Sequence, residues 1–224
     1  MKKFRTTSLI FKIILVACSA IILTACVTSP PYDYSALLER QPRSILVLPP
    51  TNDSIEVNAP YVFLSTITKP LAEKGYYVYP VAVIDAFLKE NGLPTPVEMN
   101  SIPLDKIKEH IGADAVMYVN INNWGQKYQV LSSKAVVSAS LRLIDVDTGI
   151  LLWESNAYAE QASSNNNSGG LAGLLVAALV DQVVGSVVDH TPQLSRFAND
   201  NAINNGQNGL LNGPYKPLPV AGTK

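Results

Sequence analysis

The most constraining feature of this sequence is a pair of β-strand patterns joined by a tight turn. Between positions 135 and 143, apolar and polar residues alternate, as they do in a strand that buries only one face. Positions 145–149 read Asp-Val-Asp-Thr-Gly, which are residues typical of a turn between two strands. The segment from Ile150 to Ala159 then returns, with Trp153 as a large apolar anchor. The sequence therefore predicts an antiparallel β-hairpin.

Three shorter strand patterns precede the hairpin. The segment 45–48 is wholly apolar and is followed by two prolines, which is typical of a strand that is buried on both faces. The segment 76–81 is rich in aromatic and β-branched residues, and 113–121 is largely apolar. Together with the hairpin, these segments predict a sheet of about five strands.

Helical patterns separate the strands. A first helix is expected over 58–74, with Pro60 in its first turn, and Pro70 within it predicts a kink or a restart. Further helices are expected at 83–91 and 103–111, each followed by a glycine. This alternation predicts an α/β (α+β mixed) fold, in which helices pack a mixed β-sheet that has the hairpin on its C-terminal side.

An apolar segment at 171–188 follows the polar stretch 161–170, which we expect to form a loop. Its length of about eighteen residues is near the lower limit for a membrane helix. The acidic Asp181 would be costly inside a bilayer, so we favour a helix that packs on the sheet or on a second copy of the chain. The residues of this candidate dimer helix form a four-residue repeat: Gly173, Ala177, Asp181 and Gly185.

The N-terminus has the anatomy of a secretion signal. Basic residues at positions 2, 3, 5 and 12 precede an apolar run from Ile13 to Leu23. This run of about eleven residues is shorter than the about twenty that a membrane-spanning helix needs. The sequence therefore predicts a cleaved signal at 1–25 rather than a permanent transmembrane anchor.

The end of this run, Leu23-Thr24-Ala25-Cys26, resembles the lipobox of bacterial lipoproteins. In that class of protein, a diacylglyceryl group is attached to the cysteine and a dedicated peptidase cuts before it. The resemblance implies that the three residues before Cys26 are recognised by the peptidase and that Cys26 is lipidated. Cys18 fits a similar pattern, but cleavage there would leave only about five apolar residues in the signal. We therefore expect Cys26 to be the mature N-terminus.

The mature chain is expected to consist of a tether, one domain and a tail. Residues 26–43 contain three prolines and little periodicity, which suits a tether, and 44–190 has the length of one α/β domain. Residues 191–224 are mostly Asn, Gly, Pro and Gln, and predict a poorly structured tail. Loss of the four basic residues of the signal lowers the formal net charge from −1 to about −5, which disfavours nucleic acid as a partner.

No constellation of residues in the sequence indicates catalysis. Asp145, Asp147 and Gly149 resemble the start of a calcium loop, but the further ligands are missing and the turn is favoured. The two histidines, His110 and His190, lack metal-ligand spacing, and neither a nucleophile elbow nor a Gly-rich phosphate loop is present. We expect no enzymatic activity, no metal and no cofactor.

Several segments resemble a known envelope module, the periplasmic α/β domain that CsgG-like secretion proteins share with the N-terminal part of TolB. The matching segments are 44–50, 113–116 and 141–153. Within that group the chain is similar to a family of bacterial lipoproteins that includes a neisserial surface antigen, with further matches at 75–80 and 209–215. The resemblance implies a mixed sheet packed by helices, and an outer-membrane address that faces the periplasm or the cell surface.

These features lead to the hypothesis of a non-enzymatic, lipid-anchored interaction or assembly module of the bacterial envelope. Its expected partners are the membrane, through the N-terminal lipid, another envelope lipoprotein, and a second copy of the chain. Two alternatives are a subunit of a CsgG-like secretion channel and a small-ligand-binding or hydrolytic enzyme. A channel would need extra membrane strands, whereas 122–134 is short and polar. An enzyme would need a polar pocket that the sequence does not identify.

Overall fold

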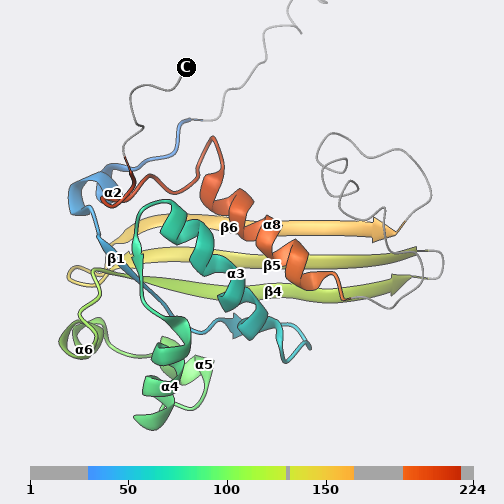
Figure 1. Ribbon diagram of the computed structural model, residues 1–224, viewed down its shortest axis with the longest axis horizontal. Helices are drawn as coiled ribbons and strands as arrows, with labels where there is room; N and C mark the ends of the chain where they lie inside the picture. The colour runs from blue at the N-terminus through green and yellow to red at the C-terminus, as the bar shows by residue number, and fades with distance from the viewer. Residues whose placement is uncertain (1–29, 130–131, 164–188, 218–224) are drawn as a thin grey trace, which may run out of the picture. The chain divides into compact units, whose positions relative to one another are not determined.

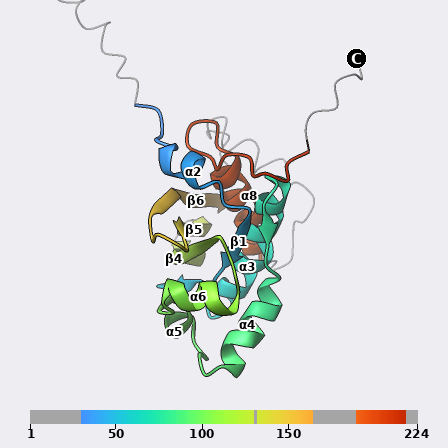
Figure 2. The same cartoon turned by 90° about the vertical axis from the view of Figure 1, so that its left-hand side faces the viewer.

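The computed structural model describes residues 30–129, 132–163 and 189–217 (Figures 1 and 2). The lipobox with Cys26 and the apolar segment 171–188 both lie outside the described residues. Within these ranges, no helix combines the length and the apolar character needed to cross a membrane.

A six-stranded mixed sheet forms the centre of the domain, which confirms the predicted fold class. The strands are β1 (Ser44–Val47), β2 (Thr51–Asn52), β3 (Tyr77–Val78), β4 (Ala115–Gln129), β5 (Ser132–Asp145) and β6 (Leu151–Ser163). Their order is β3-β1-β4-β5-β6, and β2 pairs with β4 beyond the end of β1. The pairs β1–β3, β1–β4 and β2–β4 are parallel, whereas β4–β5 and β5–β6 are antiparallel. The predicted hairpin is the β5–β6 pair.

Strands β4 and β5 are longer than the sequence predicted, because most of the segment 122–134 belongs to them. Strand β4 continues to Gln129 and pairs with β5 from Ser132 onwards. A bulge between Ile121 and Asn123 interrupts the register at the point where the apolar alternation stops. Asn122 at the bulge is exposed, and although Trp124 after it is buried, most of the following residues are polar, so the strand lacks the regular alternation by which it could be predicted.

Helices cover both faces of the sheet (Figures 1 and 2). On one face, α3 (Ala59–Glu73) and α8 (Thr191–Asn204) pack against each other, and α8 also contacts β5 and β6. On the other face, α4 (Val81–Glu90), α5 (Pro96–Asn100) and α6 (Leu104–His110) enclose an apolar cluster with β1 and β4. That cluster contains Leu46, Leu48, Ile84, Leu88, Met99, Ile107 and Val116.

Three helices lie where the sequence predicted none: α2, α8 and, between the predicted helices 83–91 and 103–111, α5. Part of the predicted tether is α2 (Ser35–Arg40), and the first part of the predicted tail is α8. In α8, four apolar residues at helical spacing are buried beneath a polar, Asn-rich face, so its low mean hydropathy concealed an amphipathic helix. These four residues are Leu194, Ala198, Ala202 and Ile203.

The polar side of α8 also contributes to its packing on α3. The hydroxyls of Thr66 and Ser195 lie 2.7 Å apart, and the side-chain amide of Asn199 donates to Thr66 at 2.9 Å. All three side chains are buried, and these hydrogen bonds pair the two hydroxyls and the Asn199 amide nitrogen, whereas the Asn199 side-chain oxygen is buried without a hydrogen-bond partner among the described residues.

Three local predictions also differ from the structure. Helix α3 continues through Pro70 to Glu73 without a restart, although Pro70 cannot donate a backbone hydrogen bond to the carbonyl of Thr66. The strand expected over 76–81 is reduced to the two residues of β3. The segment between the predicted helices 83–91 and 103–111 contains α5, which Thr95 begins with a capping box.

Candidate functional site

The β5–β6 turn confirms the hairpin interpretation of Asp145, Asp147 and Gly149. The N–H of Asp145 donates to Ile150 and that of Gly149 donates to Asp145, both at 2.9 Å. Gly149 adopts a φ of 72°, which a glycine tolerates without strain. In the described part of the chain, no group of three or more His, Cys, Asp or Glu residues is placed to hold a metal ion.

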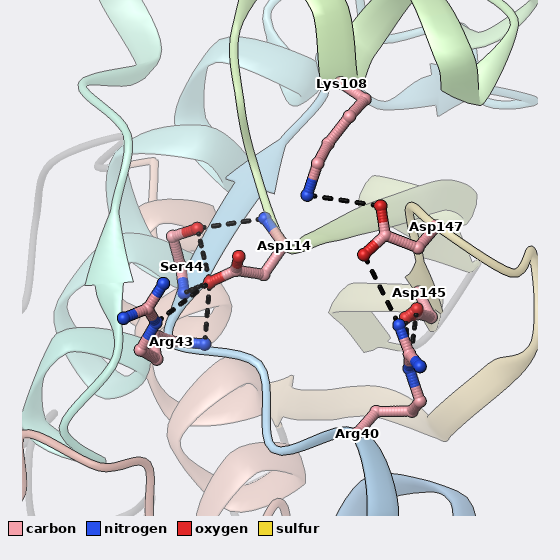
Figure 3. A network of polar contacts seen from close by, with 7 residues as sticks. All are labelled: Arg40, Arg43, Ser44, Lys108, Asp114, Asp145 and Asp147. Atoms are coloured by element: carbon pink, nitrogen blue, oxygen red, sulfur yellow. Dashed lines mark hydrogen bonds and ion pairs between the residues drawn. The ribbon is translucent and has the colours of Figure 1, made fainter.

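The two aspartates of this turn hold the helix that precedes the sheet (Figure 3). Arg40, the last residue of α2, donates through Nε to both carboxylate oxygens of Asp145, at 2.8 and 3.0 Å. Its Nη2 lies 3.4 Å from Asp147. The Asp145 side chain is only 4% exposed, and its hydrogen bond and charge raise the pKa of Arg40. We call this contact the α2 clamp.

Local backbone structure places Arg40 over the turn. Gln41 follows α2 with a left-handed φ of 44°, and its N–H donates to Leu37 at 2.9 Å. Leu37 is the buried residue of α2, at 3% exposure, so the helix is held by apolar packing as well as by the clamp. On the other side of the turn, Lys108 of α6 lies 3.2 Å from Asp147, in an exposed ion pair of small energetic value.

A second carboxylate, Asp114, fixes the start of β1 (Figure 3). It accepts hydrogen bonds from the backbone N–H of Arg43, and from the N–H and hydroxyl of Ser44, at 2.9 to 3.0 Å. Partial burial alone would raise the pKa of Asp114, but these hydrogen bonds and the charge of Arg43 together lower it.

Two depressions lie beside these carboxylates. The smaller, of about 190 Å³, is lined by residues 40–43 together with Asp114, Asp145 and Asp147. The larger, of about 570 Å³, is an open surface hollow between α6 and the β5–β6 turn. Neither is lined by a histidine: His110 lies at the exposed end of α6, and His190 directly precedes α8. The charged groups of the smaller depression pair with one another, which suits a structural role.

The chain after α8, residues 205–217, wraps back over the domain, and we call it the C-terminal strap. The indole Nε1 of Trp153 donates to Asn208 at 2.8 Å, and the hydroxyl of Tyr76 donates to Leu211 at 3.0 Å. The Tyr34 hydroxyl, just before α2, donates to the carbonyl of Gly209. The strap therefore joins α2, β6 and the end of α3, in a region where the sequence predicted an unstructured tail.

Close backbone contact explains two glycines of the strap region. Gly213 donates to Lys74 at 2.8 Å and Tyr215 donates to Gly75 at 2.9 Å. A β-carbon at Gly213 would lie 2.6 Å from the Gly75 carbonyl oxygen, and one at Gly75 would lie 2.1 Å from the Lys216 nitrogen. The strap and the end of α3 can approach this closely only because both positions lack side chains.

Tyr76 lies beneath the strap and is largely shielded from water. The residue is only 5% exposed, and burial raises the pKa of Tyr76 to about 12. Its hydroxyl therefore remains a neutral hydrogen-bond donor to the strap at any physiological pH.

Comparison with known proteins gives a consistent set of relatives. A family model described as "Putative lipoprotein GNA1162-like" matches residues 32–215. The chain is 38% identical over 205 residues to "Putative lipoprotein NMB1124/NMB1162" of Neisseria meningitidis serogroup B, covering 90% of this chain and 95% of that protein.

Solved structures also match parts of this chain. The crystal structure of lipoprotein GNA1162 from Neisseria meningitidis matches with a TM-score of 0.54 and 41% identity, over 63% of this chain and 97% of that one. The LpoB C-terminal domain from Salmonella enterica matches at a TM-score of 0.36 and 18% identity, over 64% of this chain and 92% of that one.

Proposed function

The chain belongs to the GNA1162-like family, and from this premise we propose that it is a lipid-anchored, non-enzymatic interaction module of the bacterial envelope. In this proposal Cys26 carries the lipid, and the domain faces the periplasm from the outer membrane. There it serves an assembly or transport complex together with another lipoprotein.

The anchor is supported by the sequence that precedes the domain. Leu23, Thr24 and Ala25 form a lipobox before Cys26, at the end of an apolar run of signal length. The residue after the cysteine is Val27, whereas lipoproteins retained at the inner membrane have an aspartate at this position. Outer-membrane sorting is therefore the better match. Two or three acyl chains hold a protein stably at a membrane where one does not.

The observation that carries the interaction role is the α2 clamp. The most buried carboxylate beside the depressions, Asp145, is used to fasten the segment that leads from the anchor. Asp114 is used in the same way on the first residues of β1. Charged groups that are neutralised inside the fold suit a structural role better than they suit general acid–base chemistry.

The anchor is tested by replacing Cys26 with alanine in cells fed a labelled fatty acid. The Cys26→Ala variant should lose the label and accumulate as an uncut precursor, while the matched Cys18→Ala variant should be labelled and processed normally. Unchanged labelling of Cys26→Ala would refute the assignment.

The interaction role is tested by crosslinking in intact envelopes. The lipidated protein should capture a discrete lipoprotein partner, and the Cys26→Ala variant should lose it because the two no longer share a membrane. A partner captured equally well without the anchor would contradict the role of the tether. Dimerisation through 171–188 stays a prediction, to be checked by comparing the light-scattering mass of the protein with that of the Gly173→Leu/Ala177→Leu variant.

A further inference from the structure

The α2 clamp changes the length of the tether. If residues 26–43 were all flexible, seventeen residues would separate Cys26 from β1, and they could extend to roughly 55 Å. The clamp, the buried Leu37 and the Tyr34 hydrogen bond instead fasten the chain from position 34 onwards. Only residues 27–33 remain between the anchor and the fastened part.

These seven residues set a short reach. Fully extended they cover about 25 Å, and as a flexible chain they average about 15 Å. A domain of this length is roughly 40 Å across. The tether is therefore too short to bring the opposite side of the domain to the membrane, and the side on which α2 lies stays close to the lipid.

This side of the domain carries α2, the C-terminal strap and the last residues of α3. All three lie at the upper edge of both ribbon views, with α4 at the lower edge (Figures 1 and 2). Leu38 of α2 is 58% exposed and Tyr215 of the strap is 60% exposed. Tyrosine is favoured where headgroups meet the hydrocarbon, and leucine is among the apolar residues that interfacial segments bury at that boundary.

Two lysines lie beside Tyr215. Lys74 ends α3 and is half-buried, and burial together with the nearby charge of Lys216 lowers its pKa. Lys216 is exposed and donates to the carbonyl of Glu73. Their acidic neighbours are Asp200, which partly offsets the charge at Lys74, and Glu73, which pairs with Lys69 at 3.4 Å. A negatively charged lipid phosphate would relieve the repulsion between the two ammonium groups.

We infer that the side of the domain that carries α2, the C-terminal strap and the end of α3 rests on the membrane that holds the anchor, and that its exposed residues Leu38, Tyr215 and Lys216, together with Lys74, contact anionic phospholipid there. The inference depends on the proposed anchor at Cys26. It fixes the orientation of the domain: α4 and the free faces around it point away from the membrane, toward partners.

The mature lipidated protein, reconstituted in vesicles of phosphatidylethanolamine and phosphatidylglycerol, tests this orientation. Cys26 is acylated in the proposal, so a cysteine introduced elsewhere is the one free thiol of the mature chain. A fluorophore at Leu38→Cys or Tyr215→Cys should be quenched by headgroup-attached nitroxides. The matched label at Val83→Cys, on α4 and 63% exposed, should be spared.

The outcomes separate the two proposals. Protein that fails to float with vesicles refutes the anchor, and the orientation with it. Protein that floats but shows equal quenching at the three sites, or more at position 83, overturns the orientation alone.

A charge variant tests the headgroup contact. In the double variant Lys74→Gln/Lys216→Gln, the ratio of domains in contact with the membrane to domains out of contact should fall about fivefold for each charge removed. The matched Lys106→Gln variant on α6 should change nothing. Unchanged quenching in the double variant would show that the lysines do not bind headgroups.

Discussion

Replacing Gly213 by alanine should detach the C-terminal strap from the end of α3. The added β-carbon would lie 2.6 Å from the Gly75 carbonyl oxygen and 2.9 Å from a ring carbon of Tyr76. Reaching ordinary van der Waals distance requires a shift of roughly 0.8 Å, and neither the Gly75 backbone nor the buried Tyr76 ring is the flexible end of a side chain that could yield.

That shift disrupts two hydrogen bonds, from Gly213 to Lys74 at 2.8 Å and from Tyr215 to Gly75 at 2.9 Å. At about 1 kcal/mol each, their loss should lower the free energy of unfolding by about 2 kcal/mol. The melting temperature of a domain of this size should fall by roughly 4–8 °C. If the strap opens locally instead, amide exchange at Tyr215 should accelerate about thirtyfold at an unchanged melting temperature, since each 1.4 kcal/mol is a factor of ten.

Gly206→Ala is the matched control, because a β-carbon at Gly206 meets nothing within 4 Å. Its stability should be unchanged or slightly raised, because alanine lowers the entropy of the unfolded chain. Urea unfolding and hydrogen exchange of both variants give the comparison. A Gly213→Ala protein that matches Gly206→Ala in both measurements would refute the close-approach argument.

Three further perturbations follow from the same contacts. The pKa of Tyr76 is raised to about 12, so the contribution of Tyr76 to stability is present below pH 10 and is lost as the pH rises from 10 to 12. The loss reaches up to about 1.4 kcal/mol per pH unit. Urea titrations in that window should show a steeper loss for the wild type than for Tyr76→Phe. Trp153→Phe should lower the free energy of unfolding by about 2–3 kcal/mol in chemical unfolding, because it removes the hydrogen bond to Asn208 and leaves a small cavity. A loss below about 0.5 kcal/mol would contradict the contact between Trp153 and the strap. Since the pKa of Asp114 is lowered, its contribution is present above pH 3.8 and fades as the pH falls through the folded pKa, so acid unfolding should have a shallower pH dependence in Asp114→Asn than in the wild type.

The central sheet could be predicted from the sequence because its signals are local. The apolar run of β1 and the alternation of β5 each report burial directly, and the turn at 145–149 has the residue types that its geometry needs. The ends of β4 and β5 could not be predicted in this way. Their distal residues are polar, so their pairing comes from the neighbouring strand and not from their own pattern.

The α2 clamp and the strap escaped prediction for a different reason. Arg40 and Asp145 are 105 residues apart, and a short helix with a single buried leucine gives almost no periodic signal. The strap lies in an Asn- and Gly-rich stretch whose composition resembles that of disordered chains. One signal was available: the adjacent leucines Leu210 and Leu211 interrupt the Asn- and Gly-rich stretch, and Leu210 is buried, which indicates a segment that packs.

The mass of the N-terminal tryptic peptide of the mature protein, isolated from bacterial envelopes, tests the anchored-domain account most directly. The account predicts a peptide that runs from Cys26 to Arg40 and carries the mass of a diacylglyceryl group, with or without a further acyl chain on its amine. A peptide that begins at any other residue, or an unmodified thiol at Cys26, would contradict it.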